Sequence, residues 1–396
     1  MRRVYLDNNA TTRTDPAVVA KMLPYFSEEY GNASSSHAFG IDVAAAVREA
    51  RRSVQALLGA AHDHEIVFTS GGTESNNAAI LAGLSAIAGR DEIVTTAVEH
   101  PAILSLVEHL EQTRDVKVHR IGVDGAGRLD LDAFKAALGP KTAIVSVMWA
   151  NNETGALFPV EELAKLARSV GALFHTDAVQ AAGKTPIDLK STQIDLLSLS
   201  AHKLHGPKGV GALYVRKGAK FSPFIRGGHQ ERARRGGTEN TPGIIGFGVA
   251  AELARARLAE EAARVGALRD RLERRIEDEI GRCLVSGDRA NRLPNTSNIA
   301  FFDIEGEAVL SRLDRAGIAA STGSACTAGS TEPSHVLKAM SLPENALRGA
   351  IRFSFSRENS IEDVDRVMEV LPGIVASLRE ISHAARQGAA RQFTEA

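Results

Sequence analysis

Residues 198–211 read SLSAHKLHGPKGVG: an apolar strand ends, and a lysine and a glycine-rich turn lead into the next strand. Ser200, His202 and Lys203 fall at the mouth of the first strand. A lysine buried there is costly when charged, so its pKa falls and its amine can become nucleophilic. Lys203 is therefore a candidate to form a covalent bond with an aldehyde, and Lys208 is a second candidate for the same role. A surface lysine in a tight turn explains the spacing as well.

Apolar runs alternate with helical patterns along the first two-thirds of the chain. Besides the strands on either side of this turn, we expect strands at residues 65–69, 92–96, 142–149 and 173–176. Apolar strands separated by helices predict an α/β fold whose mostly parallel sheet is covered on both faces. Ligands bind such sheets beyond the carboxyl ends of the strands. The polar residues that follow the strands are therefore the candidate site.

Composition and charge exclude several classes of protein. The 396 residues carry 47 Lys and Arg against 48 Asp and Glu, so the chain lacks the positive field of a general nucleic-acid or anionic-membrane binder. The start of the chain reaches Asp7 before any apolar segment forms, which argues against a secretory signal peptide. No apolar run approaches the roughly 18 residues of a membrane helix. We expect a cytoplasmic protein.

Three polar clusters follow expected strands. Residues 70–74, SGGTE, open a helix with free backbone N–H groups, so Gly72 and Thr73 could cradle an anion. An ordinary capped helix start is the alternative. Asp177 ends another strand, where its carboxylate could pair with a ring nitrogen or could cap the next helix. Residues 151–155, NNETG, hold the same position after a third strand, and turn residues explain them equally well.

Three further features are open to two interpretations. His100 follows a strand and could stack on an aromatic cofactor or be structural. Arg352 lies between apolar neighbours and could clamp a carboxylate or form a structural ion pair. Five basic residues lie near two glycine pairs without an interleaved aromatic residue, which favours phosphate binding or a subunit contact over nucleic acid. They are Arg226, His229, Arg232, Arg234 and Arg235.

The chain has only two cysteines, too few for a disulfide scaffold or a four-cysteine zinc site. Cys326 lies within residues 321–330, STGSACTAGS, among small polar residues. A buried structural cysteine usually lies in an apolar run, so we expect a mobile loop that presents this thiol to solvent or a cleft. Its reactivity would need a nearby cation or cofactor. Cys283 follows an apolar helical stripe and is expected to pack.

Together these motifs resemble those of the cysteine desulfurases, which are class V pyridoxal-phosphate enzymes of fold type I, and are most similar to the nitrogen-fixation, NifS-type branch. The resemblance runs almost end to end, in order and spacing. It rests on YLDNNATT (5–12), GGTESN (71–76), VEHPA (98–102), NNETG (151–155), HTDAVQ (175–180), SAHKLHGPKG (200–209), GGTEN (236–240), GSACTAGS (323–330), EPSHV (332–336) and IRFSFSR (351–357).

The resemblance implies a large cofactor-binding domain at residues 16–258, with a mostly parallel seven-stranded sheet. A smaller C-terminal α/β domain, residues 259–396, would carry the Cys326 loop. Residues 1–15 would pack with the small domain.

The same resemblance implies roles for individual residues. Lys203 would hold pyridoxal 5'-phosphate covalently, and Asp177 would pair with its pyridine nitrogen. Gln180 would contact the phenolic oxygen, while His100 would stack on the ring and relay protons. The residues implied for the phosphate are Gly72, Thr73, Ser200 and His202.

Three more residues complete the implied site. Thr238 would reach the phosphate of the other subunit's cofactor, which implies a homodimer. Asn152, which would also contact the cofactor, and Arg352 would hold the substrate carboxylate.

The implied activity removes sulfur from L-cysteine, giving L-alanine and a persulfide on Cys326. An acceptor such as an iron–sulfur scaffold would take the sulfur, for nitrogenase maturation. Cys326 could also ligate a transient [2Fe–2S] cluster shared with that scaffold. A selenocysteine lyase of the same family, or a non-enzymatic sulfur carrier or iron–sulfur assembly scaffold, is the alternative.

Overall fold

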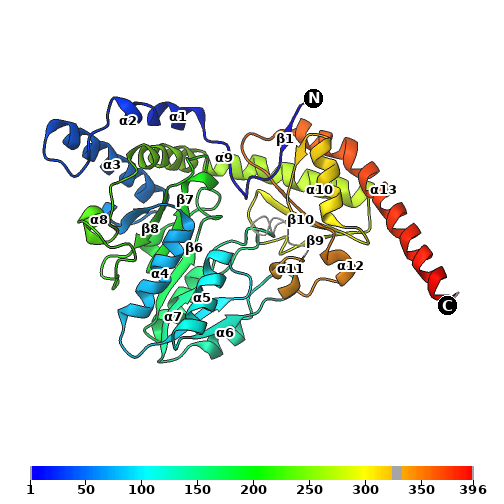
Figure 1. The fold of residues 1–396 in the computed structure, drawn as a ribbon, viewed down its shortest axis with the longest axis horizontal. Helices are drawn as coiled ribbons and strands as arrows, with labels where there is room; N and C mark the ends of the chain where they lie inside the picture. Colours follow the sequence, from blue (N-terminus) through cyan, green and yellow to red (C-terminus); the bar gives the residue numbers. More distant parts are fainter. Residues whose placement is uncertain (1, 323–331, 395–396) are drawn as a thin grey trace.

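A seven-stranded sheet forms the larger part of the computed structural model, which describes residues 2–322 and 332–394, with side chains through residue 383 (Figure 1). Its spatial order is β2-β8-β7-β6-β5-β3-β4. β8 runs antiparallel to both neighbours, and the other pairs are parallel. This confirms the mostly parallel α/β sheet. The strands are Ile66–Thr69 (β2), Glu92–Thr96 (β3), Lys117–Ile121 (β4), Thr142–Ser146 (β5), Leu173–Asp177 (β6), Leu196–Ser200 (β7) and Gly211–Val215 (β8).

The strands alternate their side chains between two apolar cores, because successive residues of a strand point to opposite faces. Phe68 and Val145 lie in one core, which includes residues of α3, α7 and α9. Val67 and Ile144 lie in the other, which includes residues of α4 and α5. Both faces are therefore covered. The helices of this part are Pro16–Met22 (α1), Pro24–Ser27 (α2), Ala38–Leu57 (α3), Gly72–Ala86 (α4), Pro101–Thr113 (α5), Leu131–Ala137 (α6), Val160–Ser169 (α7), Gln230–Ala233 (α8) and Thr241–Glu279 (α9).

Two strands differ from the sequence prediction. The edge strand β4 was not predicted: its sequence KVHRI has a single fully buried residue, Ile121, so it lacks an apolar run. The strand expected to reach residue 149 ends as regular structure at Ser146. Val147 and Trp149 still donate backbone hydrogen bonds to β6, at 3.1 and 2.9 Å. The chain thus follows β6 to the edge of the sheet where the polar residues gather.

A third apolar core, the C-terminal core, lies in the C-terminal part and includes the N-terminal strand. The antiparallel sheet β12-β10-β9 forms its centre, while β1 pairs in parallel with β11. The N-terminal segment thus joins the C-terminal part. The elements are Val4–Tyr5 (β1), Cys283–Ser286 (β9), Thr296–Phe301 (β10), Ile318–Ala319 (β11), Ala350–Ser354 (β12), Gly306–Arg315 (α10), His335–Ala339 (α11), Glu344–Leu347 (α12) and Ile361–Thr394 (α13).

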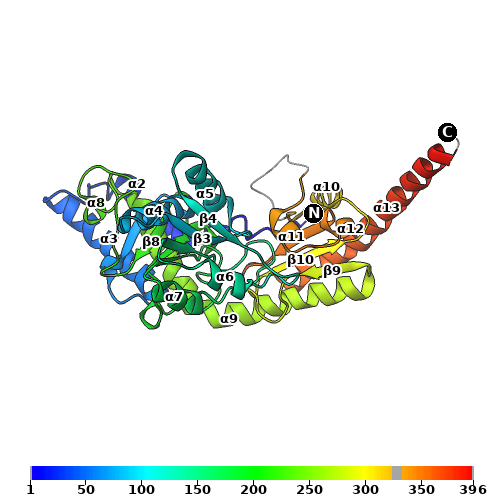
Figure 2. The same cartoon turned by 90° about the horizontal axis from the view of Figure 1, so that it is seen from below.

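The 39-residue helix α9 connects the two parts, and Figure 2 shows it running beneath both. Ile244 and Phe247 belong to one core of the large sheet, whereas Leu272 and Ile276 belong to the C-terminal core. The domain boundary expected after residue 258 lies inside this continuous helix, and the domain limits stay a prediction. Within the described residues, no helix combines the length and apolar character needed to cross a membrane.

Candidate active site

A cavity of about 350 Å³ lies where the carboxyl ends of the parallel strands meet the N-terminal segment. Ten of the site residues that the resemblance implied line it. The predicted residues in its wall are Gly72, Thr73, His100, Asn152, Asp177, Gln180, Ser200, His202, Lys203 and Arg352. Asn9, Ala10, Asn76, Met148, Ala150 and Val179 complete the wall.

Lys203 enters the cavity from a 3₁₀ turn, Ala201–Lys203, that follows β7 directly. Its Nζ donates to the backbone carbonyls of Asn9 at 2.6 Å and Ala10 at 2.7 Å. The competing Lys208 is exposed and does not line the cavity. Of these two lysines, only Lys203 is placed to act on a ligand bound here.

Asp177 ends β6 with its carboxylate buried at the cavity wall. Oδ1 accepts from the backbone N–H of Val179 at 2.9 Å, and Oδ2 accepts from Asn76 Nδ2 at 2.7 Å. The carboxylate therefore makes a local turn contact and also faces the cavity. Asn76 lies within the GGTESN motif, but its pairing with Asp177 spans 101 residues and has no local signature.

His100 caps the N-terminus of α5, where its Nδ1 accepts from the Ala102 N–H at 3.1 Å. Burial lowers the pKa of His100; Asp177 opposes this, while the neighbouring Lys203 and His335 side chains reinforce it. The ring is therefore neutral near pH 7. Since Nδ1 is the acceptor, the proton lies on Nε2.

The N-terminus of α4 reaches the cavity through Gly72 and Thr73, opposite Ser200 and His202. A Cβ on Gly72 would lie 2.8 Å from Val179 Cγ2, so any larger residue would force that side chain to shift. Burial lowers the pKa of His202 to about 4, with smaller contributions from neighbouring lysines. A neutral imidazole and free helical N–H groups can bind an anion here.

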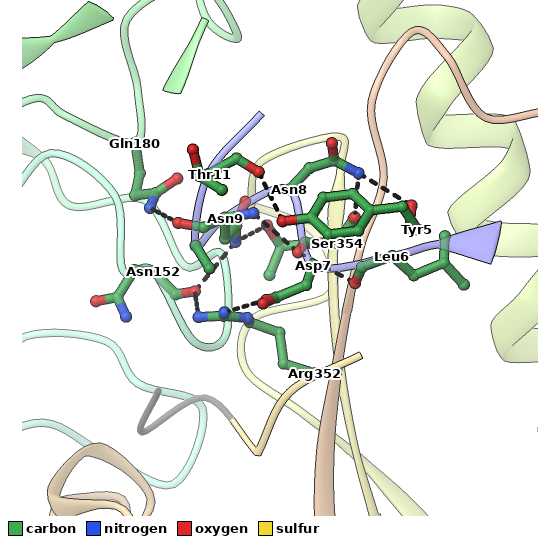
Figure 3. A network of polar contacts seen from close by, with 12 residues as sticks. Tyr5, Leu6, Asp7, Asn8, Asn9, Thr11, Asn152, Gln180, Arg352 and Ser354 are labelled. Atoms are coloured by element: carbon green, nitrogen blue, oxygen red, sulfur yellow. Dashed lines mark hydrogen bonds and ion pairs between the residues drawn. The ribbon is translucent and has the colours of Figure 1, made fainter. Parts of the chain in front are cut away.

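Arg352 is only 2% exposed and lies beside the N-terminal segment (Figure 3). Its Nη2 pairs with Asp7 Oδ1 at 2.7 Å, and its Nη1 donates to the Asn152 carbonyl at 3.0 Å. The sequence suggested either a clamp or a structural ion pair, and the guanidinium both forms an ion pair and lines the cavity. The sequence did not single out Asp7 for any role in the site.

Asn9 connects several cavity residues and is 2% exposed (Figure 3). Its carbonyl accepts from Gln180 Nε2 at 2.9 Å as well as from Lys203. Its Nδ2 donates to the Asn152 carbonyl at 3.0 Å and to Thr296 Oγ1 at 2.8 Å. The YLDNNATT segment thus ties the site to the C-terminal sheet.

Two ionisable groups beside the cavity were also missed. Lys184 donates to Gln180 Oε1 at 2.9 Å, and burial with the nearby charges of Lys203 and Arg352 lowers its pKa to about 7. Glu99 is fully buried; burial raises its pKa to about 8, although Met148 N–H and Thr96 Oγ1 donate to its Oε1. No local pattern signals either environment.

The remaining predictions concern Thr238, Cys326 and Cys283. Thr238 is exposed and does not line it. Cys326 and its expected loop lie outside the described residues. Cys283 is half-buried against the C-terminal core, and burial raises its pKa. Among residues 2–322 and 332–394, no group of three His, Cys, Asp or Glu side chains could hold a metal ion.

Comparison with known proteins assigns the chain to a family. The sequence pattern of the aminotransferase class-V family matches residues 4–367. A cysteine desulfurase of Gluconacetobacter diazotrophicus is 66% identical over 382 residues, 96% of each chain. The cysteine desulfurase NifS of Azotobacter vinelandii is 57% identical over 96% of this chain and 95% of its own. A solved NifS-like protein superposes with a TM-score of 0.89 at 37% identity, over 95% of this chain and 100% of its own. The chain therefore belongs to the aminotransferase class-V family, in which the Gluconacetobacter and Azotobacter relatives are cysteine desulfurases.

Proposed function

We propose that this chain is a cysteine desulfurase that uses pyridoxal 5'-phosphate to convert L-cysteine into L-alanine and a persulfide on Cys326. One observation carries the proposal: an amine, a carboxylate and a helix N-terminus converge on one cavity. They are Lys203 Nζ, the Asp177 carboxylate and the first turn of α4. The family implies the same cofactor.

The residues present fit this cofactor. The cavity of about 350 Å³ lies within the roughly 300–1,000 Å³ typical of small-ligand pockets. Asp177 supplies a carboxylate for a pyridine nitrogen, and Gln180 carries a side-chain amide for the phenolic oxygen. Gly72, Thr73, Ser200 and His202 surround the helix N-terminus, where a phosphate group is favoured.

When bound, the cofactor supplies an electron sink that stabilises negative charge on the Cα of an attached amino acid. Lys203 would hold the aldehyde and, as a free amine, would accept the Cα proton. Neutral His100, protonated on Nε2, would exchange a proton with the bound amino acid. Asn152 and Arg352 would bind the substrate carboxylate.

The sulfur step balances without an added oxidant or reductant. The Cys326 thiolate attacks the substrate sulfur, the Cβ–S bond breaks, and the bonding electrons and a proton stay with the three-carbon product. L-cysteine and one thiol thus give L-alanine and one persulfide. We propose an iron–sulfur scaffold as the acceptor, with nitrogenase maturation as the use, which the 57% identity to a NifS supports.

Two features extend this proposal. Cys326 could contribute one thiolate to a [2Fe–2S] cluster shared transiently with the scaffold. A reactive thiol works where thiols stay reduced, which supports a cytoplasmic location.

We also propose a homodimer. Thr238 lies outside the cavity of its own chain, so its implied phosphate contact requires a second copy. Large apolar side chains are exposed along α1 to α3, where that copy could cover them. They are Val19, Leu23, Phe26, Tyr30, Phe39 and Ile41.

The deciding experiment incubates the cofactor-loaded protein with L-cysteine, quantifies L-alanine, and maps the persulfide by mass spectrometry. We expect equimolar alanine and persulfide in a single turnover, with the extra sulfur on Cys326. Cys326→Ala should abolish this, whereas Cys283→Ser serves as the matched control and should not. Undiminished alanine formation by Cys326→Ala, or persulfide on Cys283, would refute the assignment.

A further inference from the structure

The Arg352 guanidinium is partly committed before any substrate binds. Nη2 is paired with Asp7 at 2.7 Å and Nη1 with the Asn152 carbonyl at 3.0 Å. Nε is buried and has no hydrogen-bond partner within the described residues. Arginine carries five N–H donors, so the two contacts leave donors for a carboxylate in the same plane.

Asp7 is itself held firmly against the strand that carries Arg352. The backbone of Asp7 forms a bridge with Ser354 of β12, and the next residue, Asn8, donates to the Ser354 carbonyl through its N–H at 3.1 Å and its Nδ2 at 2.9 Å. On the other side, Leu6 N–H donates to Ala319 at 2.8 Å. These bonds fix the Asp7 backbone relative to Arg352 on both sides.

We propose that Asp7 is a positioning residue for substrate recognition: its carboxylate orients the Arg352 guanidinium so that the remaining N–H donors receive the substrate carboxylate. This inference rests on the proposed function, because it assumes an amino-acid substrate whose carboxylate meets Arg352. It adds a residue that acts through Arg352 without touching the substrate.

In the competing view, the Asp7 carboxylate occupies the Arg352 guanidinium, and the substrate carboxylate must displace it. The two views predict opposite signs. If Asp7 orients the guanidinium, its removal weakens the binding of carboxylate ligands, because the arginine loses its fixed plane. If Asp7 competes for the guanidinium, its removal tightens their binding, because the positive charge is released.

The experiment compares Asp7→Ala, Asp7→Asn, Arg352→Lys and the double variant Asp7→Ala/Arg352→Lys in the holoenzyme. The readouts are KM and kcat for L-cysteine and the Kd for L-alanine, followed by the cofactor's absorbance. Asp15→Ala is the matched control. Asp15 forms a comparable carboxylate–arginine pair, 2.5 Å from Arg357 Nη2, with a residue that does not line the cavity.

We expect Asp7→Ala to raise KM and the Kd for L-alanine about 10-fold with kcat changed less than about 3-fold, as expected for one lost charge-assisted bond. Asp7→Asn keeps an acceptor at the same place and should show a smaller loss. The double variant should bind L-alanine no more weakly than Arg352→Lys does, because both substitutions act through the side chain at position 352. Asp15→Ala should lower thermal stability and leave KM unchanged.

Tighter L-alanine binding by Asp7→Ala and Asp7→Asn would overturn the positioning role, as would effects that add fully in the double variant. If Asp7→Ala does not fold, the sign of the change in Asp7→Asn decides between the two views. Wild-type turnover of L-cysteine is measured first. Its absence would refute the proposed function, whereas the variants test only the role of Asp7.

Discussion

The amine of Lys203 donates to the backbone carbonyl of Asn9 at 2.6 Å, although 194 residues separate them. The same carbonyl accepts from Gln180, and the Asn9 side chain reaches the C-terminal sheet through Thr296. One buried asparagine therefore links two cavity residues of the large sheet to the C-terminal sheet. The N-terminal segment is thus a structural part of the site.

The Asn9→Ala substitution tests this link. It removes the bonds to the Asn152 carbonyl and Thr296 and leaves buried polar groups unpaired, so we expect a loss of about 3 kcal/mol of unfolding free energy. The cofactor's absorbance should also change, because Lys203 and Gln180 share the displaced carbonyl. Asn8→Ala is the control: Asn8 is equally buried but bonds to Ser354 and Asn359 outside the cavity. A similar spectral change in both variants would contradict the link.

Asn76 should tune the Asp177 carboxylate. Its Nδ2 donates a charge-assisted bond at 2.7 Å, and such bonds are worth about 1.5–3 kcal/mol. We expect Asn76→Ala to lower kcat about 10-fold or more and to shift the cofactor's absorbance, with Asn76→Asp worse because it brings a second carboxylate close. Asn77→Ala, on the same helix and outside the cavity, should behave as wild type. Unchanged spectra and rates in Asn76→Ala would exclude this role.

Lys184 should orient Gln180, since it donates to Oε1 and so directs the amide nitrogen to the opposite side. We expect Lys184→Met to weaken cofactor binding about 10-fold, as for one lost charge-assisted bond. With a pKa near 7, the lysine is charged only at lower pH, so the loss should be larger at pH 6 than at pH 8. Equilibrium dialysis at both pH values measures the affinity for the cofactor. Lys190→Met, at an exposed lysine, is the control. A pH-independent loss would contradict the interpretation.

Glu99 should make the wild-type protein less stable as the pH rises. Its pKa in the folded state is about 8, above the value near 4.3 of an unfolded chain, so the native state binds an extra proton between these values. Stability contributed by the protonated form is complete below about pH 4 and is lost as the pH rises toward 8. We expect Glu99→Gln, which stays neutral, to show a shallower decline between pH 5 and 8 in chemical denaturation. Parallel curves for the two proteins would show that Glu99 does not retain its proton.

The apolar face on α1 to α3 should mediate the dimer. Phe26 and Phe39 are 65% and 55% exposed in the single chain, so a charge at either position would oppose burial against a second copy. We expect Phe26→Glu/Phe39→Glu to sediment as a monomer in analytical ultracentrifugation and to lose cofactor affinity, because Thr238 is then not supplied. Ile381→Glu, on an equally exposed residue of α13, is the control. A variant that remains dimeric would refute this interface.

The sequence by itself determined the large sheet and most of the cavity wall. Strand periodicity predicts six of the seven strands, because each predicted strand is a run of buried apolar residues bounded by turn residues. Gly72, Asp177 and Lys203 were identifiable because each lies at or within a few residues of the end of such a strand, where ligands meet parallel sheets. The edge strand β4 was not predicted, because its partly exposed residues do not form an apolar run.

The tertiary structure alone decided which side chains act on one another. Asp7 with Arg352 and Asn9 with Lys203 meet across 345 and 194 residues, and Lys184 acquires its low pKa only where burial and other cations surround it. Hydrogen bonds and desolvation depend on distance in space, and a linear pattern records only separation along the chain. The motifs therefore predicted which side chains could take part in the reaction. The folded structure determined which other residues hold those side chains in position.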